Sequence, residues 1–84
     1  MKITVLTPDK EIFTGEIYSV KVPGTAGEFQ VLKNHAALVS SLERGRVTIK
    51  KTEKGEDDLV FMIGKGFIEV LNNNISLLVQ GVKE

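Results

Sequence analysis

The side chains that could support chemistry in this sequence are few and form no recognisable catalytic set. The chain has one His, His35, and no Cys, so it can form neither a Cys–His pair nor a Cys/His zinc cluster. Serine-type catalysis would need a Ser and an acid beside His35, with an oxyanion hole, and no nucleophile-elbow motif is present. We therefore expect a non-catalytic protein in which His35 is a surface or hydrogen-bonded structural residue.

Two other groups of residues could in principle bind a ligand. The segments Gly24–Gly27 and Gly64–Gly66 are rich in Gly, but neither continues into the Gly-Lys-Ser/Thr signature of a phosphate-binding loop. The acidic residues Glu53 and Glu56–Asp58 could attract a cation, but they lack the spacing and the Gly of a calcium loop. We assign both groups to turns between strands and expect no cofactor and no metal.

Length and charge limit the classes of protein that remain. The 84 residues form one domain, residues 1–84, which is small enough to need support from a partner because Cys is absent. The 11 Lys and Arg residues balance 11 Asp and Glu residues, which argues against nucleic acid as a partner. No apolar stretch approaches the roughly 20 residues of a membrane span. We expect a soluble cytoplasmic domain that does not insert directly into a membrane.

Hydrophobic spacing repeatedly takes period two, which is typical of half-buried strands. Apolar and polar residues alternate over residues 3–5, 18–22 and 46–50, and Ile75, Leu77 and Val79 share one face of a further run. Turn-forming residues separate the runs at 7–10, 23–27, 54–57, 64–66 and 72–74. Residues 35–43 fit one helical turn or a strand, and we interpret them as a strand. The pattern predicts an all-β fold, an antiparallel β-sandwich of about ten short strands with no substantial helix.

One predicted strand, Leu59–Ile63, is apolar on both faces. In a two-layer sandwich, one face of such a strand has no core of its own to enter. It is either a central strand whose outer face is covered by a loop or a docking surface. Val60 and Met62 are the residues that would contact a partner in the second case.

Several segments resemble the epsilon subunit of bacterial rotary ATP synthases. Residues 27–39 (Gly-Glu-Phe-Gln-Val-Leu-Lys-Asn-His-Ala-Ala-Leu-Val) are similar to that family's Gly-Glu-hydrophobe-x-hydrophobe run and the Gly-His-Ala-Pro-Leu that follows it. Residues 3–15 resemble its first strands and Phe-x-Gly turn. Gly45 with 47–49 falls where the family has a Gly and a strand, and residues 61–70 resemble its hydrophobic strand, Gly-x-Gly turn and Glu-Val strand. The resemblance spans nearly the whole chain.

The resemblance implies a ten-stranded β-sandwich at the foot of the central stalk. This agrees with the antiparallel β-sandwich of about ten strands that the alternating runs and turns predict. In that family the domain binds the gamma subunit and rests on the polar loops of the rotor-ring c subunits, turning with both. The resemblance implies ring contact by Gly27 and Glu28 and gamma contact by His35, to which we add Val60 and Met62. The chain would then help to couple proton flow to ATP synthesis as a peripheral protein at the cytoplasmic face of the inner (plasma) membrane.

The sequence departs from the family at two places. Lys33-Asn34 stands where the family commonly has Pro-Gly before the His, and Ala37 stands where it has Pro. Asn34 can adopt the left-handed conformation that a Gly would supply. The family usually continues into a two-helix C-terminal domain that can restrain ATP hydrolysis, whereas this sequence ends at Glu84. We therefore expect no helical inhibitory domain, in either a naturally short subunit or an excised domain.

Two alternatives remain from the sequence alone. A free-standing β-sandwich module could bind a ligand such as carbohydrate, but it would usually present exposed aromatic side chains, and the chain has only four Phe, one Tyr and no Trp. A small enzyme is the third hypothesis, and the absence of a paired acid and base disfavours it.

Overall fold

The computed structural model describes residues 1–55 and 59–83, and every regular element within them is a β-strand. The strands of these residues are β1 (Lys2–Leu6), β2 (Glu11–Glu16), β3 (Ser19–Gly24), β4 (Gly27–Val31), β5 (Leu38–Leu42), β6 (Gly45–Lys50), β7 (Leu59–Ile63), β8 (Lys65–Leu71) and β9 (Asn74–Gln80). The all-β prediction is confirmed, and so is the strand predicted within residues 35–43.

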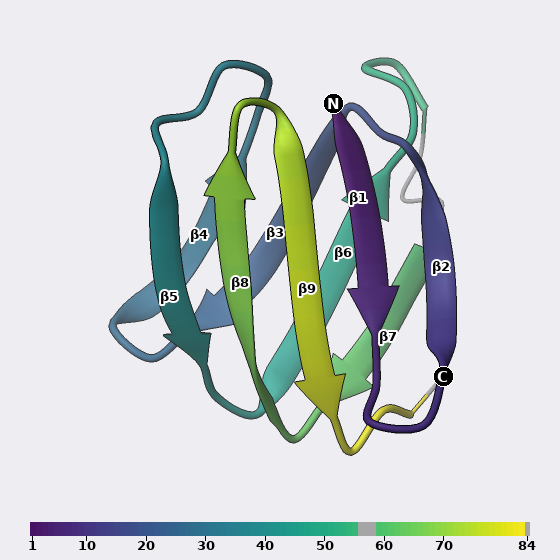
Figure 1. Cartoon of the computed structure of the whole chain (residues 1–84), viewed down its shortest axis with the longest axis vertical. Helices are drawn as coiled ribbons and strands as arrows, with labels where there is room; N and C mark the ends of the chain where they lie inside the picture. Colours follow the sequence, from purple (N-terminus) through teal and green to yellow (C-terminus); the bar gives the residue numbers. More distant parts are fainter. Residues whose placement is uncertain (56–58, 84) are drawn as a thin grey trace.

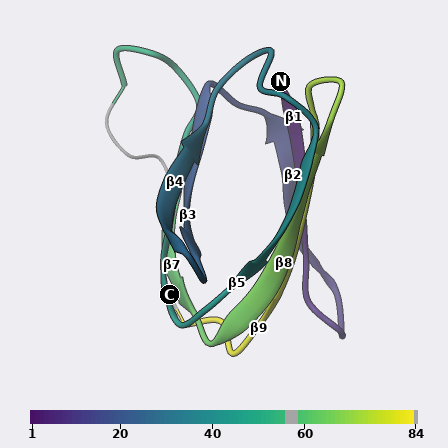
Figure 2. The ribbon, with the colours of Figure 1, turned by 90° about the vertical axis from the view of Figure 1, so that its left-hand side faces the viewer.

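The strands form the two layers of a sandwich, seen one in front of the other in Figure 1 and side by side in Figure 2. The hydrogen-bonded path runs β2-β1-β9-β8-β5-β3-β6-β7, with β4 paired to β3. The front layer is β2-β1-β9-β8-β5, and the rear layer is β4-β3-β6-β7. The layers meet where β5 pairs with β3 through Gly24 and Leu42.

One strand pair departs from the wholly antiparallel arrangement that we predicted. β1 and β9 are parallel, with Lys2 opposite Asn74 and Leu6 opposite Leu78. Both strands start at the same end of the sandwich, where the Lys2 amide donates a hydrogen bond of 2.9 Å to the Asn73 carbonyl. The sequence could not reveal this, because parallel and antiparallel strands share the same alternation of side chains.

The core lies between the layers and consists of alternate residues of the strands, together with Ile17 from the connection between β2 and β3. Its apolar side chains, each at most 5% exposed, are Ile3, Val5, Ile17, Val20, Val22, Val31, Leu42, Val47, Ile49, Phe61, Ile63, Ile68, Val70, Ile75, Leu77 and Val79. Full burial of one such side chain contributes about 1.5–3 kcal/mol. The inward face predicted for Ile75, Leu77 and Val79 is confirmed.

The turn between β8 and β9 has the geometry that its Asn residues predict. Asn72 and Asn73 lie between the paired residues Leu71 and Asn74, and their φ angles are 49° and 62°. A two-residue type I′ hairpin requires positive φ at both positions, which Asn tolerates well. Of the predicted turn at 54–57, the structure describes 54 and 55, whereas Glu56–Asp58 lie outside the described residues.

Candidate interaction surfaces

The hairpin between β3 and β4 presents Gly27 and Glu28, the predicted ring contacts. Residues 25–26 form its tip, because Gly24 pairs with Gly27. Gly27 has a φ of 130°, a conformation that L-residues rarely adopt. A Cβ atom on Gly24 would lie 2.7 Å from the Gly27 carbonyl oxygen. Both Gly residues are therefore required by the backbone of this hairpin. This agrees with the assignment of residues 24–27 to a turn between strands.

The hairpin is anchored to strand β5. The Thr25 amide donates a hydrogen bond of 3.1 Å to the Ser41 carbonyl, and the hydroxyl oxygens of the same two residues are 3.0 Å apart. Glu28 is exposed, and its carboxylate makes no ion pair within residues 1–55 and 59–83. A preorganised hairpin with a free carboxylate can accept hydrogen bonds from a partner at little entropic cost.

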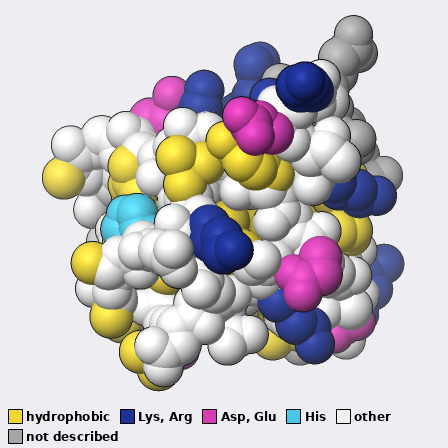
Figure 3. Space-filling model, turned by 90° about the horizontal axis from the view of Figure 1, so that it is seen from above, with side chains coloured by type: hydrophobic (Ala, Val, Ile, Leu, Met, Phe, Trp, Pro, Cys, Tyr) yellow, Lys and Arg dark blue, Asp and Glu magenta, His cyan; other side chains and the backbone are white. Residues whose placement is uncertain are grey.

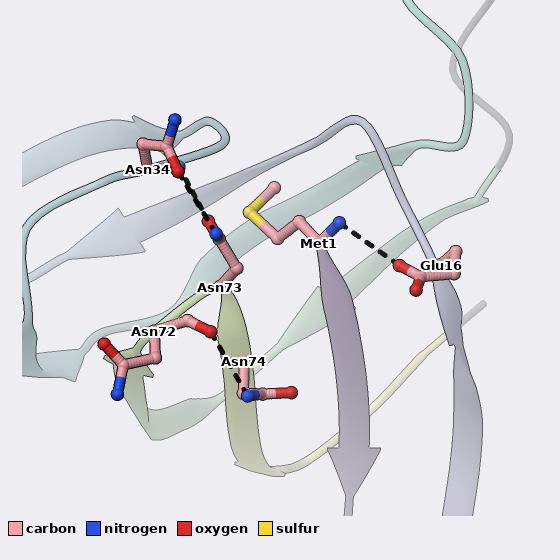
Figure 4. Close-up of polar contacts among 6 residues, drawn as sticks. All are labelled: Met1, Glu16, Asn34, Asn72, Asn73 and Asn74. Carbon is pink, nitrogen blue, oxygen red and sulfur yellow. Dashed lines mark hydrogen bonds and ion pairs between the residues drawn. The ribbon is translucent and has the colours of Figure 1, made fainter.

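The loop between β4 and β5 is held by a pair of Asn residues (Figure 4). The Asn34 amide donates a hydrogen bond of 2.7 Å to Oδ1 of Asn73, and Nδ2 of Asn73 donates one of 3.2 Å to Oδ1 of Asn34. Asn34 has a φ of 66°, which confirms the left-handed conformation expected of it. The pairing itself could not be predicted from the sequence, because the two Asn residues are 39 positions apart.

His35 follows directly in this loop and is half-buried. Its Nδ1 atom lies 2.7 Å from the Ala36 carbonyl oxygen. Because a carbonyl oxygen can only accept, Nδ1 donates this hydrogen bond. The expectation of a hydrogen-bonded His is confirmed.

The hairpin and the loop share one open groove of about 540 Å³, which is lined by Glu28 and His35 together with Gly27, Val39 and Ser40. The resemblance assigned Glu28 to the ring and His35 to gamma. The structure therefore brings together two residues that the sequence assigned to different partners.

Val60 and Met62 lie apart from this groove. They are 42% and 43% exposed on β7, whereas Phe61 and Ile63 between and beside them are buried. β7 ends the hydrogen-bonded path, and Figure 1 shows it on the opposite side of the sandwich from β4 and β5. The Met62 amide and carbonyl pair with Lys83 at 2.8 and 2.9 Å, which closes part of the free edge of β7. The predicted gamma contacts thus do not form one compact patch.

A larger apolar surface lies on the outer side of the front layer, and the sequence reasoning missed it. We call it the acid-centred face, and it consists of Val39, Phe67, Glu69, Leu71 and Leu78. The four apolar side chains are 71%, 59%, 53% and 49% exposed in that order, and Glu69 is also exposed. The sequence held a signal for it, since the charge of Glu69 marks the solvent side of β8 and places Phe67 and Leu71 on the same side.

These surfaces contain no assembled catalytic group among the residues that the structure describes. The Ser40 hydroxyl donates to the Ser41 carbonyl at 3.1 Å and His35 donates to Ala36, so this Ser and His do not pair. Over the same residues, no three His, Cys, Asp or Glu side chains are placed to hold a metal ion. None of the described residues belongs to a helix that could cross a membrane. Figure 3 shows basic and acidic side chains interspersed on the end that it views.

The whole chain, residues 1–84, matches the family model described as the β-sandwich domain of the ATP synthase delta/epsilon chain. The chain belongs to this family. It is 42% identical over 81 residues to the ATP synthase epsilon chain of Chlorobium limicola, covering 96% of this chain and 90% of that relative. It is 44% identical over 80 residues to the epsilon chain of Chlorobaculum tepidum, covering 95% and 89%.

A solved structure shows the same fold. A chain in the central stalk and c-ring structure of the Tetrahymena thermophila mitochondrial ATP synthase superimposes with a TM-score of 0.83, at 17% sequence identity. The match covers 100% of this chain and 66% of that chain. The resemblance to the epsilon family that the motifs indicated is thus confirmed for the sequence and for the fold.

Proposed function

We propose that this protein is a non-catalytic subunit of the central stalk of an F-type ATP synthase, where it links the gamma subunit to the rotor ring. The observation that carries the proposal is the family match over residues 1–84, together with 42% identity to an epsilon chain of which 90% is covered. In this role the protein turns with gamma and the c subunits and supports the coupling of proton flow to ATP synthesis. It is a peripheral component at the cytoplasmic face of the inner (plasma) membrane.

The ring contact in this proposal is made by the β3–β4 hairpin. Its support is the rigid backbone at Gly27, the link from Thr25 to β5 and the carboxylate of Glu28, which makes no ion pair with any residue that the structure describes. Polar loops of the c subunits can donate hydrogen bonds to such a carboxylate. Rim charges of this kind affect the rate of association and specificity more than affinity.

The gamma contact in this proposal includes His35, Val60 and Met62. His35 offers its ring atom Nε2, and the two β7 side chains offer exposed apolar area. Because the β4–β5 loop, which carries His35, and strand β7 lie on opposite sides of the sandwich (Figure 1), gamma has to contact more of the surface than these residues alone.

The test is co-purification of the tagged chain with purified gamma and with the isolated ring. We expect stable complexes with both, and we expect Met62→Asp to weaken gamma binding more than Glu28→Ala weakens ring binding. Equal or reversed losses would contradict that residue ranking. Absence of binding to both partners, with a stable complex with a sugar instead, would contradict the proposed function and favour the ligand-binding module.

A further inference from the structure

We propose that strand β4 pairs with β4 of a second copy of this chain. The two strands run antiparallel about Phe29, so the rear layers of the two copies form one continuous sheet. The inference goes beyond the proposed function and does not rest on it. It adds one consequence to that function: the pairing covers Glu28, so a chain that is bound to its copy cannot bind the ring through this residue.

One edge of β4 has no partner strand among the described residues, since β4 pairs with β3 alone. Figure 1 shows it at the left margin of the rear layer. The Pro23 carbonyl accepts a hydrogen bond of 2.9 Å from the Glu43 amide, on the other side of β3. Directly opposed residues of an antiparallel pair turn their backbone groups either toward or away from each other. Glu28, opposite Pro23, therefore directs its amide and carbonyl to the open edge, and so does Gln30.

The other two edge strands of the described residues are less suited to pairing. The edge of β7 is partly closed by Lys83, whose amide and carbonyl bond to Met62 at 2.9 and 2.8 Å. β2 carries a carboxylate at each end, Glu11 and Glu16. Charges on an edge strand act against edge-to-edge pairing. β4 carries one carboxylate, that of Glu28, and the proposed pairing places no second charge opposite it.

The sequence of β4 is complementary to itself about Phe29. This residue is the middle one of the five residues Gly27–Val31, so a two-fold axis at Phe29 pairs the whole strand with its copy. Glu28 of each copy is then opposite Gln30 of the other, and the amide of each donates to the carbonyl of the other. A two-fold axis at Glu28 instead would place two carboxylates directly opposite each other, which is unfavourable.

The side chains support the same register. Glu28 and Gln30 are exposed, and the side-chain amide of Gln30 can donate to the Glu28 carboxylate of the other copy. Phe29 is half-buried, packs against the core and lines the open groove of about 540 Å³ beside Leu38. The two Phe29 residues form a pair without backbone hydrogen bonds, in which the Cα atoms are about 4.5 Å apart. Their rings can therefore contact each other and cover apolar surface of both grooves.

The pairing is weak because the strand is short. An interface built on five residues of each copy falls in the class of small, transient interfaces. We expect a dissociation constant of about 0.1–1 mM. Pairing of this strength protects the open edge of β4 in chains that have not yet been assembled, and the ring can displace the second copy from Glu28.

The experiment is sedimentation equilibrium of the full chain at concentrations up to about 1 mM. Gln30→Glu places two carboxylates opposite each other on both sides of the axis and should weaken dimerisation about tenfold, whereas Gln30→Lys should strengthen it about fivefold. Glu28→Gln combined with Gln30→Glu exchanges the two side chains and should restore the parent affinity within about twofold. Gln80→Glu is the matched control, because it makes the same charge change at an exposed residue of β9.

A second variant tests the backbone of the pairing. Gln30→Pro removes an amide that points to the open edge, so the hydrogen bonds between β3 and β4 remain while dimerisation should be lost. Hydrogen exchange on the parent chain should show protection of the Glu28 and Gln30 amides that rises with concentration. Thermal unfolding of dilute samples checks that each variant is folded.

The outcomes separate this inference from the proposed function. A parent chain that stays monomeric at about 1 mM overturns the inference. So does a dimer that Gln30→Glu leaves unchanged, or one that Gln80→Glu weakens equally. If the chain dimerises as described but does not bind the isolated ring, the inference stands and the proposed ring contact fails. If the ring binds the dimer without separating the copies, the ring contact stands and the exclusion at Glu28 is wrong.

Discussion

Replacing Asn73 by Gly should loosen the loop that carries His35 and leave the β8–β9 turn in place. The Asn73 side chain accepts a hydrogen bond of 2.7 Å from the Asn34 amide and donates one of 3.2 Å to the Asn34 side chain. Gly reaches positive φ readily. The turn conformation at a φ of 62° is therefore retained, while both hydrogen bonds are lost.

The magnitude follows from these two contacts. One intramolecular hydrogen bond contributes about 0.5–1.5 kcal/mol net, and since both bonds here are exposed we take about 1 kcal/mol for the pair. Asn73→Ala loses the same bonds and also places a Cβ atom in the left-handed region, which costs roughly 1 kcal/mol more. In a domain of this size, 1 kcal/mol lowers the Tm by about 4–8 °C.

Thermal unfolding of the parent chain, Asn73→Gly and Asn73→Ala tests this predicted order of stability. Hydrogen exchange at the Asn34 amide reports the local effect. Asn34→Gly removes the Oδ1 acceptor and keeps the amide donor, so the double variant with Asn73→Gly isolates the bond between the side chains. Unchanged stability and unchanged protection of the Asn34 amide in Asn73→Gly would refute the reasoning. Equal stability of Asn73→Ala and Asn73→Gly would refute the argument from φ.

Three further substitutions test the packing and the backbone. Gly66→Ala should destabilise the chain by about 1–3 kcal/mol, because the new Cβ atom would clash with the Leu78 carbonyl oxygen. Gly64→Ala is the milder control, since its Cβ atom would lie 3.4 Å from the nearest neighbouring atom. Equal urea midpoints for the two variants would contradict this. Leu77→Ala should lower the free energy of unfolding by about 2–5 kcal/mol through the cavity that it leaves, and a loss below about 1 kcal/mol in urea unfolding would mean that the core closes around the site. Gly27→Ala should cost about 1–3 kcal/mol through its φ of 130° alone, since no atom of the described residues lies within 4 Å of the added Cβ atom. A Tm equal to that of the parent chain would show that the hairpin readily adopts another conformation.

The all-β fold could be predicted from local pattern, because the alternation of apolar and polar residues along each strand indicates which side chains are buried. Ile75, Leu77 and Val79 alternate with less buried residues, and the structure buries all three. Asn72 and Asn73 encode their turn through a backbone conformation that few other residues tolerate. The parallel pairing of β1 with β9 was not predictable, because it depends on which ends of the strands meet and not on any residue type.

The candidate site could be predicted only in part. The apolar character of both faces of β7 left open whether its outer face is covered by a loop or exposed, and the structure exposes Val60 and Met62 there. The acid-centred face was missed because its members come from three strands that are adjacent in the fold and distant in the chain. A single strand shows one apolar residue in every two, which is equally compatible with a second packed layer and with solvent.

The sequence by itself indicated an all-β fold and showed that the chain has no Cys, and its motifs indicated the family that the comparisons then showed. These properties depend on residue types and on spacings of a few positions, which local sterics and the pleat of a strand translate directly into structure. The tertiary structure decided which side chains share a surface. The pairing of Asn34 with Asn73, the groove common to Glu28 and His35, and the cluster around Glu69 each join residues from different strands or loops. Their proximity is set by strand order and register. The alternation of apolar and polar residues along one strand does not show which strand lies beside it.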